Sequence, residues 1–128
     1  HFYATSNPET FISLRGSFDL IICTVSANID WNQYLQLLRL NGTMVLVGIP
    51  EKDTPPVEAF DLIGKRRSLA GSLIGGIKET QEMLDFCGRH DIVCDIEKIA
   101  MSDVNTAYER VVKSDVRYRF VLDLATIK

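Results

Sequence analysis

Small and polar residues recur at three places where an apolar, strand-like run of the sequence ends. These places are residues 24–28, residues 48–52 and residues 72–76. In an open parallel sheet, ligands bind beyond the carboxyl ends of the strands, where loops expose backbone N–H groups. A glycine such as Gly48, or the pair Gly75 and Gly76, lets a flat ring or a ribose approach the main chain closely. The three loops together predict one ligand-binding edge.

Side chains that could carry catalysis are scarce. Ser26 lacks the Gly-x-Ser-x-Gly turn that exposes a nucleophilic serine. Cys23 lies within an apolar run, which predicts a buried and inert thiol. His90 ends a predicted helix, where an imidazolium interacts with the helix dipole. The glycine fingerprint Gly-x-Gly-x-x-Gly of dinucleotide binding is absent from the sequence. We therefore predict no catalytic residue within this chain.

The three cysteines, Cys23, Cys87 and Cys94, form an odd set without a Cys-x-x-Cys pair. Such spacing fits reduced thiols better than a disulfide framework. Together with His90 they also lack the ligand spacing of a zinc finger or a zinc ribbon. The sequence predicts no metal site in this chain and favours a cytoplasmic location.

The composition narrows the classes of partner. The 128 residues carry 14 Lys and Arg against 17 Asp and Glu, a formal net charge of -3. No excess positive charge attracts phosphate backbones or anionic lipid, so we expect neither nucleic acid nor a membrane as a partner. The apolar runs are far shorter than the roughly 20 residues that span a bilayer. The fractions of hydrophobic and charged residues, 46% and 24%, are typical of one globular core.

Apolar runs alternate with helix-period segments from about Phe18 onward, which is the pattern of repeated strand–helix–strand units. Near-continuous apolar runs predict parallel strands over residues 18–25, 43–47 and 68–73, the first of them covered on both faces. Alternating polarity over residues 117–124 predicts a closing strand with one solvent-exposed face. The predicted class is α/β with a parallel sheet.

Helices are predicted between and after these strands. The first begins after Asp30 and runs for about ten residues, until Asn41 and Gly42 end it. A loop at residues 51–56 leads to a short helix at residues 57–63. Apolar residues at helical spacing predict two more helices, over residues 77–87 and residues 104–112, the last of which Ser102 or Asp103 caps.

Four stretches of the sequence carry a family resemblance. They read Asp-x-Ile-Ile-x-Thr-Val-Ser-Ala, Gly-Thr-Met-Val-Leu-Val-Gly-Ile-Pro-Glu-Lys, Arg-Arg-Ser-Leu-Ala-Gly-Ser-Leu-Ile-Gly-Gly-Ile-Lys-Glu-Thr-Gln-Glu-Met-Leu-Asp-Phe and Asp-Val-Arg-Tyr-Arg-Phe-Val-Leu-Asp. In this order they resemble the zinc-dependent medium-chain alcohol dehydrogenases, in particular the cinnamyl alcohol dehydrogenase-like branch. The resemblance extends over residues 18–124, most of the chain.

The resemblance implies the second half of a Rossmann doubly wound parallel sheet, followed by a C-terminal strand that returns towards a catalytic domain. Residues 1–100 would form part of the NADP-binding Rossmann domain, and residues 101–128 the returning helix and strand. The family transfers hydride between NADP(H) and a primary alcohol or aldehyde, with zinc as Lewis acid. The zinc ligands and the glycine fingerprint would lie outside these 128 residues, which begin with His1 rather than Met. We therefore expect a C-terminal fragment that is inactive alone.

The resemblance also implies cofactor contacts at the strand ends. Thr24 would lie against the cofactor, and Gly48 would border the nicotinamide together with its two neighbours. Residues 72–74 would touch the nicotinamide ribose and carboxamide through backbone groups, and Arg119, or alternatively Arg117, would approach the phosphates. The implied cofactor-binding set is Thr24, Val47, Gly48, Ile49, Ser72, Leu73, Ile74 and Arg119.

Two further implications concern assembly and anchoring. Residues 68–73 match the strand through which the family joins two sheets across a two-fold axis, so we expect a homodimer. Cys23 replaces an aspartate that is common in the family. We expect this change to alter the anchoring of the following loop without abolishing binding.

Two other functions fit part of the pattern. The strand–helix–strand segment over residues 18–47 also resembles the latter half of S-adenosylmethionine-dependent methyltransferases. Those enzymes end in an antiparallel hairpin, whereas this sequence continues as a strand and then a helix. The other alternative is a stand-alone dimerisation or nucleotide-binding module, in which the apolar strand at residues 18–25 would have an unpaired edge prone to aggregation.

Overall fold

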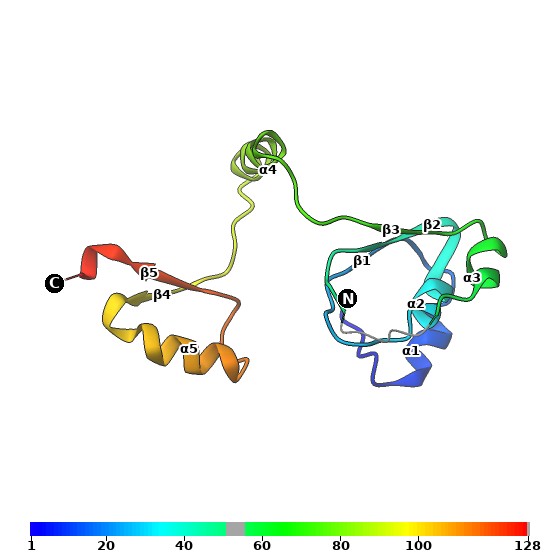
Figure 1. Cartoon of the computed structure of the whole chain (residues 1–128), viewed down its shortest axis with the longest axis horizontal. Helices are drawn as coiled ribbons and strands as arrows, with labels where there is room; N and C mark the ends of the chain where they lie inside the picture. The colour runs from blue at the N-terminus through cyan, green and yellow to red at the C-terminus, as the bar shows by residue number, and fades with distance from the viewer. Residues whose placement is uncertain (51–55, 128) are drawn as a thin grey trace. The chain divides into compact units, whose positions relative to one another are not determined.

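The computed structural model describes residues 1–50 and 56–127 and forms two compact units, His1–Ile74 and Gly75–Lys128. Figure 1 shows the first unit in blue to green and the second in green to red. The predicted loop at residues 51–56 lies outside the described residues except for Pro56, and the predicted binding loop at residues 48–52 is described only as far as Pro50. A domain boundary after residue 100 stays a prediction.

A parallel sheet organises the first unit. Its strands are β1 (Phe18–Cys23), β2 (Leu38–Leu46) and β3 (Ser68–Gly71), in the order β1-β2-β3, and both pairings are parallel. This arrangement confirms the predicted α/β class with a parallel sheet. Two strands are shorter than predicted, with β1 ending at Cys23 rather than residue 25 and β3 ending at Gly71 rather than residue 73. The third, β2, is longer, because it begins at Leu38 rather than residue 43 and ends at Leu46 rather than residue 47.

The core of the first unit lies on one face of this sheet. Helix α2 (Trp31–Leu37) supplies Leu35, which is fully buried together with Leu38 and Met44 of β2. On the opposite face, Leu20 and Ile22 of β1 remain 54% and 61% exposed. The expectation that the first strand is covered on both faces is therefore wrong within this unit. The reason is that its helices pack against the face that carries Cys23 and Met44.

The end of α2 differs from the prediction. The helix stops at Leu37 instead of continuing to Asn41, because Leu38 has extended backbone angles and begins β2. Arg67 explains this end: its guanidinium donates to the carbonyl oxygens of Gln36 and Leu38, at 3.3 Å and 2.9 Å from Nη2. Asn41 then adopts a left-handed φ of 62° within β2, so the Asn-Gly pair bends a strand and does not cap a helix.

Two more helices complete the first unit. Helix α1 (Pro8–Ser13) was not predicted, although its start follows a familiar pattern: the side chain of Asn7 accepts from the N–H of Glu9 at 3.1 Å, and proline occupies the first turn. Helix α3 (Ala59–Ile63) confirms the short helix expected before β3. No helix in the described part of the chain is long and apolar enough to cross a bilayer.

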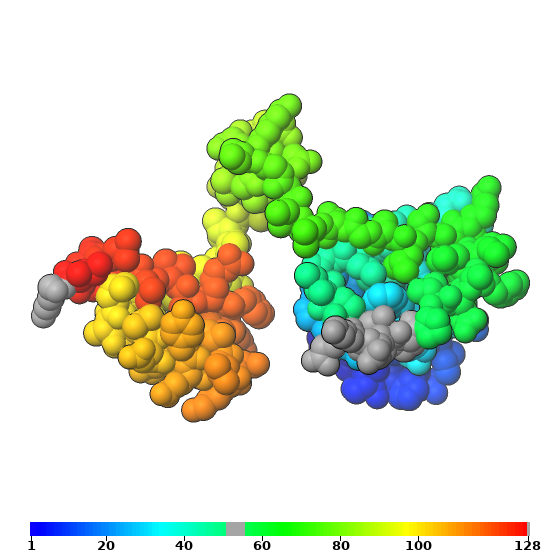
Figure 2. All heavy atoms as spheres, in the orientation of Figure 1, coloured from blue at the N-terminus to red at the C-terminus, as the bar shows by residue number. Residues whose placement is uncertain are grey.

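The second unit begins with α4 (Ile77–Arg89), whose first turn is closed by a hydrogen bond of 2.8 Å from the N–H of Gly76 to Glu79. A parallel pair follows, β4 (Glu97–Ala100) and β5 (Phe120–Asp123), connected through α5 (Val104–Val112). Short 3₁₀ turns, η1 (Met101–Asp103) and η2 (Leu124–Thr126), follow the two strands. Figure 2 shows the yellow-to-orange side chains of α5 beside the red ones of β5. The helices predicted over residues 77–87 and 104–112 are confirmed. The predicted closing strand is confirmed over a shorter range, Phe120–Asp123 instead of residues 117–124.

Candidate functional site

The carboxyl ends of the three strands of the first unit meet at one edge. Cys23 is paired with Leu46, and Leu46 with Gly71, so the chain leaves all three strands at the same level of the sheet. Hydrogen bonds continue just past these ends. The N–H groups of Val47 and Gly48 donate to the carbonyl oxygen of Cys23 at 3.0 and 3.2 Å, and the N–H of Ser72 donates to that of Leu46 at 3.0 Å. The three loops predicted to form a binding edge therefore start side by side.

A pocket of about 340 Å³ lies at this edge. It is formed where the segments after β2 and β3 diverge, and five of the eight predicted cofactor-binding residues line it. The complete lining is Leu46, Val47, Gly48, Ile49, Gly71, Ser72 and Leu73. Leu46 and Gly71 were not predicted, although they are the last residues of their strands and the position alone could have indicated them.

Gly48 is packed so closely that no side chain fits at its position. A Cβ atom there would lie 2.5 Å from the carbonyl oxygen of Val25 and 2.8 Å from that of Thr24. Since real Cβ contacts are longer, only glycine lets these two backbones touch. Thr24 is thereby held behind Gly48 through its main chain, while its own side chain is exposed.

The wall of the pocket is apolar and open. Ile49 and Leu73 are 74% and 73% exposed, and no lining residue is ionisable. Ile74, the next residue, is also exposed but is not part of the lining. Exposed large apolar side chains around glycine-rich backbone suit contact with a flat organic ring. The arrangement can bind and orient such a ring, and its side chains offer no proton donor or acceptor of catalytic strength.

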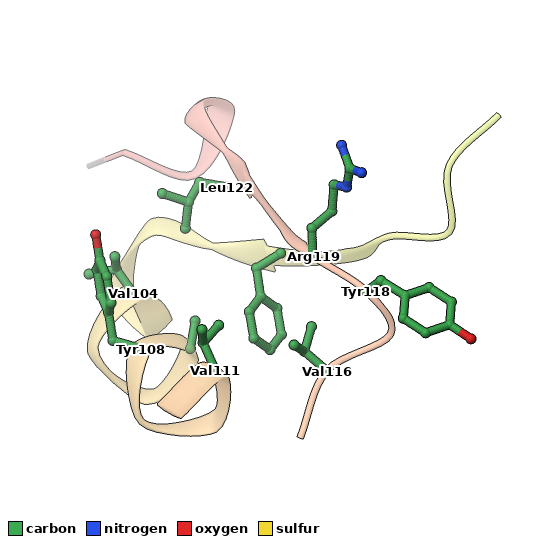
Figure 3. Close-up of a pocket in the computed structure, with 9 residues that line it drawn as sticks. Val104, Tyr108, Val111, Val116, Tyr118, Arg119 and Leu122 are labelled. Atoms are coloured by element: carbon green, nitrogen blue, oxygen red, sulfur yellow. The ribbon is translucent and has the colours of Figure 1, made fainter. Parts of the chain in front are cut away.

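Arg119 lies in the second unit, and its alternative Arg117 does too. The backbone carbonyl of Arg119 accepts from the N–H of Glu97 at 3.0 Å, just before β5. Arg119 borders a separate pocket of about 370 Å³ between α5 and β5. Figure 3 shows Val104, Tyr108 and Val111 of α5 facing this pocket, while the side chain of Arg119 points away from the helix.

The described residues hold no group of three or more His, Cys, Asp or Glu side chains that could bind a metal ion. The described side chains therefore do not provide such a set of ligands for a zinc ion. Cys23 is buried, and its thiol belongs to the core cluster beside Leu35, Leu38 and Met44. His90 stacks its ring on Phe86 with a centroid distance of 4.4 Å at the end of α4.

An open parallel sheet with a pocket at the carboxyl ends of its strands defines an α/β protein of Rossmann-like fold, the class in which ligands bind at this edge. The family model described as zinc-binding dehydrogenase matches residues 3–89, and the chain belongs to this family. The chain is 58% identical over 127 residues to NADP-dependent alcohol dehydrogenase C 1 of Mycolicibacterium smegmatis. This match covers 99% of the chain and 36% of that relative.

Solved structures agree with the family. The cinnamyl alcohol dehydrogenase SbCAD4 of Sorghum bicolor matches with a TM-score of 0.86 and 39% identity, covering 98% of this chain and 35% of that one. The cinnamyl alcohol dehydrogenase of Helicobacter pylori, solved with NADP(H), matches with a TM-score of 0.75 and 38% identity, covering 92% and 35%. The predicted resemblance is confirmed, and a methyltransferase is not supported. The chain spans about a third of the length of these proteins.

Proposed function

We propose that this chain supplies the nicotinamide side of the cofactor site in an NADP(H)-dependent alcohol dehydrogenase or aldehyde reductase. One observation carries the proposal: five residues that the family resemblance implies as cofactor contacts line one pocket at the carboxyl edge of the sheet. Bound there, the cofactor would donate or accept hydride. Two relatives support NADP(H) as the cofactor: one is an NADP-dependent alcohol dehydrogenase, and the other was solved in complex with NADP(H).

The proposed roles of the residues are those that the family resemblance implies, and the shape of the pocket supports them. Val47, Gly48 and Ile49 form one wall, against which the nicotinamide ring lies by apolar contact. Ser72 and Leu73 form the other wall and offer backbone groups to the ribose and the carboxamide. The close contact between Gly48 and the main chain of Thr24 fixes the first wall. Ile74 and Arg119 complete the proposed set, Ile74 at the rim and Arg119 on the phosphates.

We propose that the whole enzyme binds zinc through residues other than those described here. The described residues offer no group of three or more metal-binding side chains, so the ion would be held by other sequence of the protein. We derive no step of the reaction through it. The substrate proposed from the family is a primary alcohol or an aldehyde.

The remaining assignments are also proposals. In the described sheet, β3 pairs only with β2, so its outer edge is available for pairing with a second copy. We therefore propose a homodimer through residues 68–73. We further propose a cytoplasmic protein without nucleic-acid or membrane partners, with residues 1–100 in the cofactor-binding domain and residues 101–128 returning towards a catalytic domain. A stand-alone dimerisation or nucleotide-binding module is the alternative.

The test is a titration of the ¹⁵N-labelled chain with NADPH, followed by two-dimensional NMR. We expect the amide signals of Gly48 and Ser72 to shift with NADPH, and to stay in place with S-adenosylmethionine. A parallel titration with NADH, which lacks the 2'-phosphate of NADPH, shows which of the shifts depend on that phosphate. Shifts confined to residues away from the 340 Å³ pocket, or none at millimolar NADPH, would contradict the proposal.

A further inference from the structure

A second pocket of the first unit lies at the amino ends of the strands, opposite to the candidate site. Its volume is about 170 Å³. Arg15, Gln36 and Arg67 belong to its lining and occur just before β1, β2 and β3 respectively. Since the strands are parallel, segments that precede them gather at one edge. The full lining is Arg15, Gln36, Phe60, Asp61, Gly64, Lys65 and Arg67, which we call the basic pocket.

The basic pocket concentrates positive charge. Three cationic side chains, Arg15, Lys65 and Arg67, share it with one carboxylate, that of Asp61. The lining therefore carries a formal charge of +2 in a chain whose net charge is -3. Within the described residues, neither Arg15 nor Lys65 forms an ion pair. Charges of one sign around a small concave surface attract a counter-ion.

Of the three cations, Arg67 stabilises the fold through hydrogen bonds to backbone carbonyl oxygens. Its guanidinium donates to the carbonyl oxygens of Leu38 and Asp61, both at 2.9 Å, and to that of Gln36 at 3.3 Å. Burial lowers the pKa of Arg67, the Asp61 charge opposes this shift, and the positive charge of Arg15 adds to it. Arg15 and Arg67 both line the basic pocket, where their like charges repel each other. This repulsion is relieved when an anion lies between them.

The ammonium group of Lys65 lies close to Gly16, the residue after Arg15. Its Nζ lies 3.1 Å from the point that a Cβ of Gly16 would occupy, so a glycine next to Arg15 leaves room for the ammonium group. Gly16 has a left-handed φ of 69° and donates its N–H to the carbonyl oxygen of Gln36 at 3.1 Å. The turn at Gly16 therefore brings the ammonium of Lys65 to the segment that carries Arg15.

A simpler role for Arg15, Lys65 and Arg67 would be to donate hydrogen bonds to the free carbonyl oxygens at the ends of the nearby helices. Arg67 performs it, since the carbonyl oxygens it contacts are those around the end of α2. The side chains of Arg15 and Lys65 make no hydrogen bond to a carbonyl oxygen in the described part of the chain. Arg15 and Lys65 are both exposed members of the pocket lining, and neither has an ion pair or a side-chain hydrogen bond within the described residues.

We propose that the basic pocket binds a phosphate group, carried by inorganic phosphate or by a small phosphate monoester, with Arg15 and Lys65 as its ligands. A dianionic oxyanion offers several acceptor oxygens to a guanidinium and an ammonium at once. The pocket of about 170 Å³ is large enough for a phosphate group but not for a dinucleotide. The site lies at the edge opposite to the cofactor pocket and does not depend on the proposed function.

The test is titration of the ¹⁵N-labelled chain with sodium phosphate at constant ionic strength, with sodium chloride as the reference titration. We expect the amide signals of Gly16 and Gly64 to shift with phosphate and not with chloride. A second titration with glycerol phosphate distinguishes a free ion from a monoester. If the monoester binds at least as tightly as phosphate, the site accepts a substituted phosphate, and if only phosphate binds, the site takes the free ion.

Substitutions then assign the ligands. We expect Arg15→Gln and Lys65→Gln each to weaken phosphate binding by about fivefold or more. Arg66→Gln is the matched control, because Arg66 is exposed, adjacent and outside the lining. We expect little change from it. Equal weakening by all three variants would overturn the proposal, as would phosphate shifts centred on Gly48 and Ser72 in the unsubstituted chain.

Discussion

The guanidinium of Arg110 on α5 lies 2.8 Å from a carboxylate oxygen of Glu97 on β4. The same side chain pairs with Asp115 at 2.9 Å and lies over the ring of Phe120 on β5, 4.8 Å from its centroid. One arginine therefore connects the helix to both strands of the second unit. A sheet of two strands needs such support, because two strands alone are marginally stable in water.

The first prediction concerns pH and Glu97. The backbone N–H of Arg117, 3.1 Å from Glu97, and the side chain of Arg110 lower the pKa of Glu97 below its ordinary value of 4.5. The ionised carboxylate therefore stabilises the folded state above pH 4.5, and this stabilisation is lost as the pH falls through the lower, folded-state pKa. We expect Glu97→Gln to lower the melting temperature of the second unit at pH 7 and to have a smaller effect at pH 3.

The measurement is thermal unfolding of the second unit, followed through the NMR signals of α5. Glu109→Gln is the matched control, because it removes an exposed carboxylate from α5 of the same unit and leaves the ion pair of Glu97 with Arg110 in place. If both variants lower the melting temperature equally at pH 7, the contacts of Glu97 do not produce the effect.

The second prediction concerns the core of the first unit. Leu35 is fully buried against Leu38 and Met44, so truncation leaves a cavity. We expect Leu35→Ala to lower the free energy of unfolding by about 2–5 kcal/mol. Trp31, the single tryptophan, packs against this core and reports its unfolding by fluorescence. Ile12→Ala on α1 is the control, because Ile12 is 68% exposed, and a comparable loss there would contradict the assignment of the core.

The third prediction separates two glycines by the space around them. A Cβ at Gly48 meets the backbone oxygens of Thr24 and Val25, whereas a Cβ at Gly88 in α4 meets nothing within 4 Å. We expect Gly48→Ala to destabilise the first unit by about 1–3 kcal/mol. We expect Gly88→Ala to leave the second unit unchanged or to stabilise it by up to about 1 kcal/mol.

Trp31 fluorescence measures the first of these effects and helical circular dichroism the second. Gly48→Ala should also displace the NADPH-dependent NMR signals of the candidate site, since the wall of the pocket has to move. A Gly48→Ala chain with unchanged unfolding would show that the contact with residues 24 and 25 relaxes without cost.

The fourth prediction concerns turnover. The lining of the candidate site contains no ionisable side chain, and the described residues contain no group of three or more His, Cys, Asp or Glu side chains that could hold a metal ion. We expect the 128-residue chain to show no aldehyde-dependent oxidation of NADPH, with or without added Zn²⁺. Absorbance at 340 nm measures the rate. A rate above that of a blank without the chain would contradict the prediction.

The parallel sheet could be predicted because short apolar runs alternate with helix-period segments, and this pattern is typical of parallel strands connected by helices. The limits of the elements could not. Leu35 and Leu38 are three residues apart, which fits one face of a helix, yet Leu38 belongs to a strand. The interaction that ends the helix comes from Arg67, 29 residues further along the chain. Local periodicity contains no information about such a contact.

The candidate site was predictable in part for a similar reason. Residues that follow parallel strands must gather at one edge, so Gly48 and Ser72 could be placed there from the sequence. The close approach of Gly48 to Thr24 depends on how two loops pack, which no spacing shows. The basic pocket was not predicted either. Arg15 and Lys65 lie about 50 residues apart in the sequence, and the pocket forms only where the segments before three different strands pack together.

The common level at which β1, β2 and β3 end makes the candidate site sensitive to chain length more than to side-chain identity. Removing one residue from the continuously paired part of β2, residues 43–46, would shift Val47 and Gly48 by about 3.3 Å along the sheet and turn their neighbours to the opposite face. Ser72 and Thr24 would stay where they are. We therefore expect the walls of this pocket to tolerate changes of their apolar side chains, whereas an insertion or deletion within residues 43–46, where β2 pairs in continuous register with both neighbours, displaces one wall from the other.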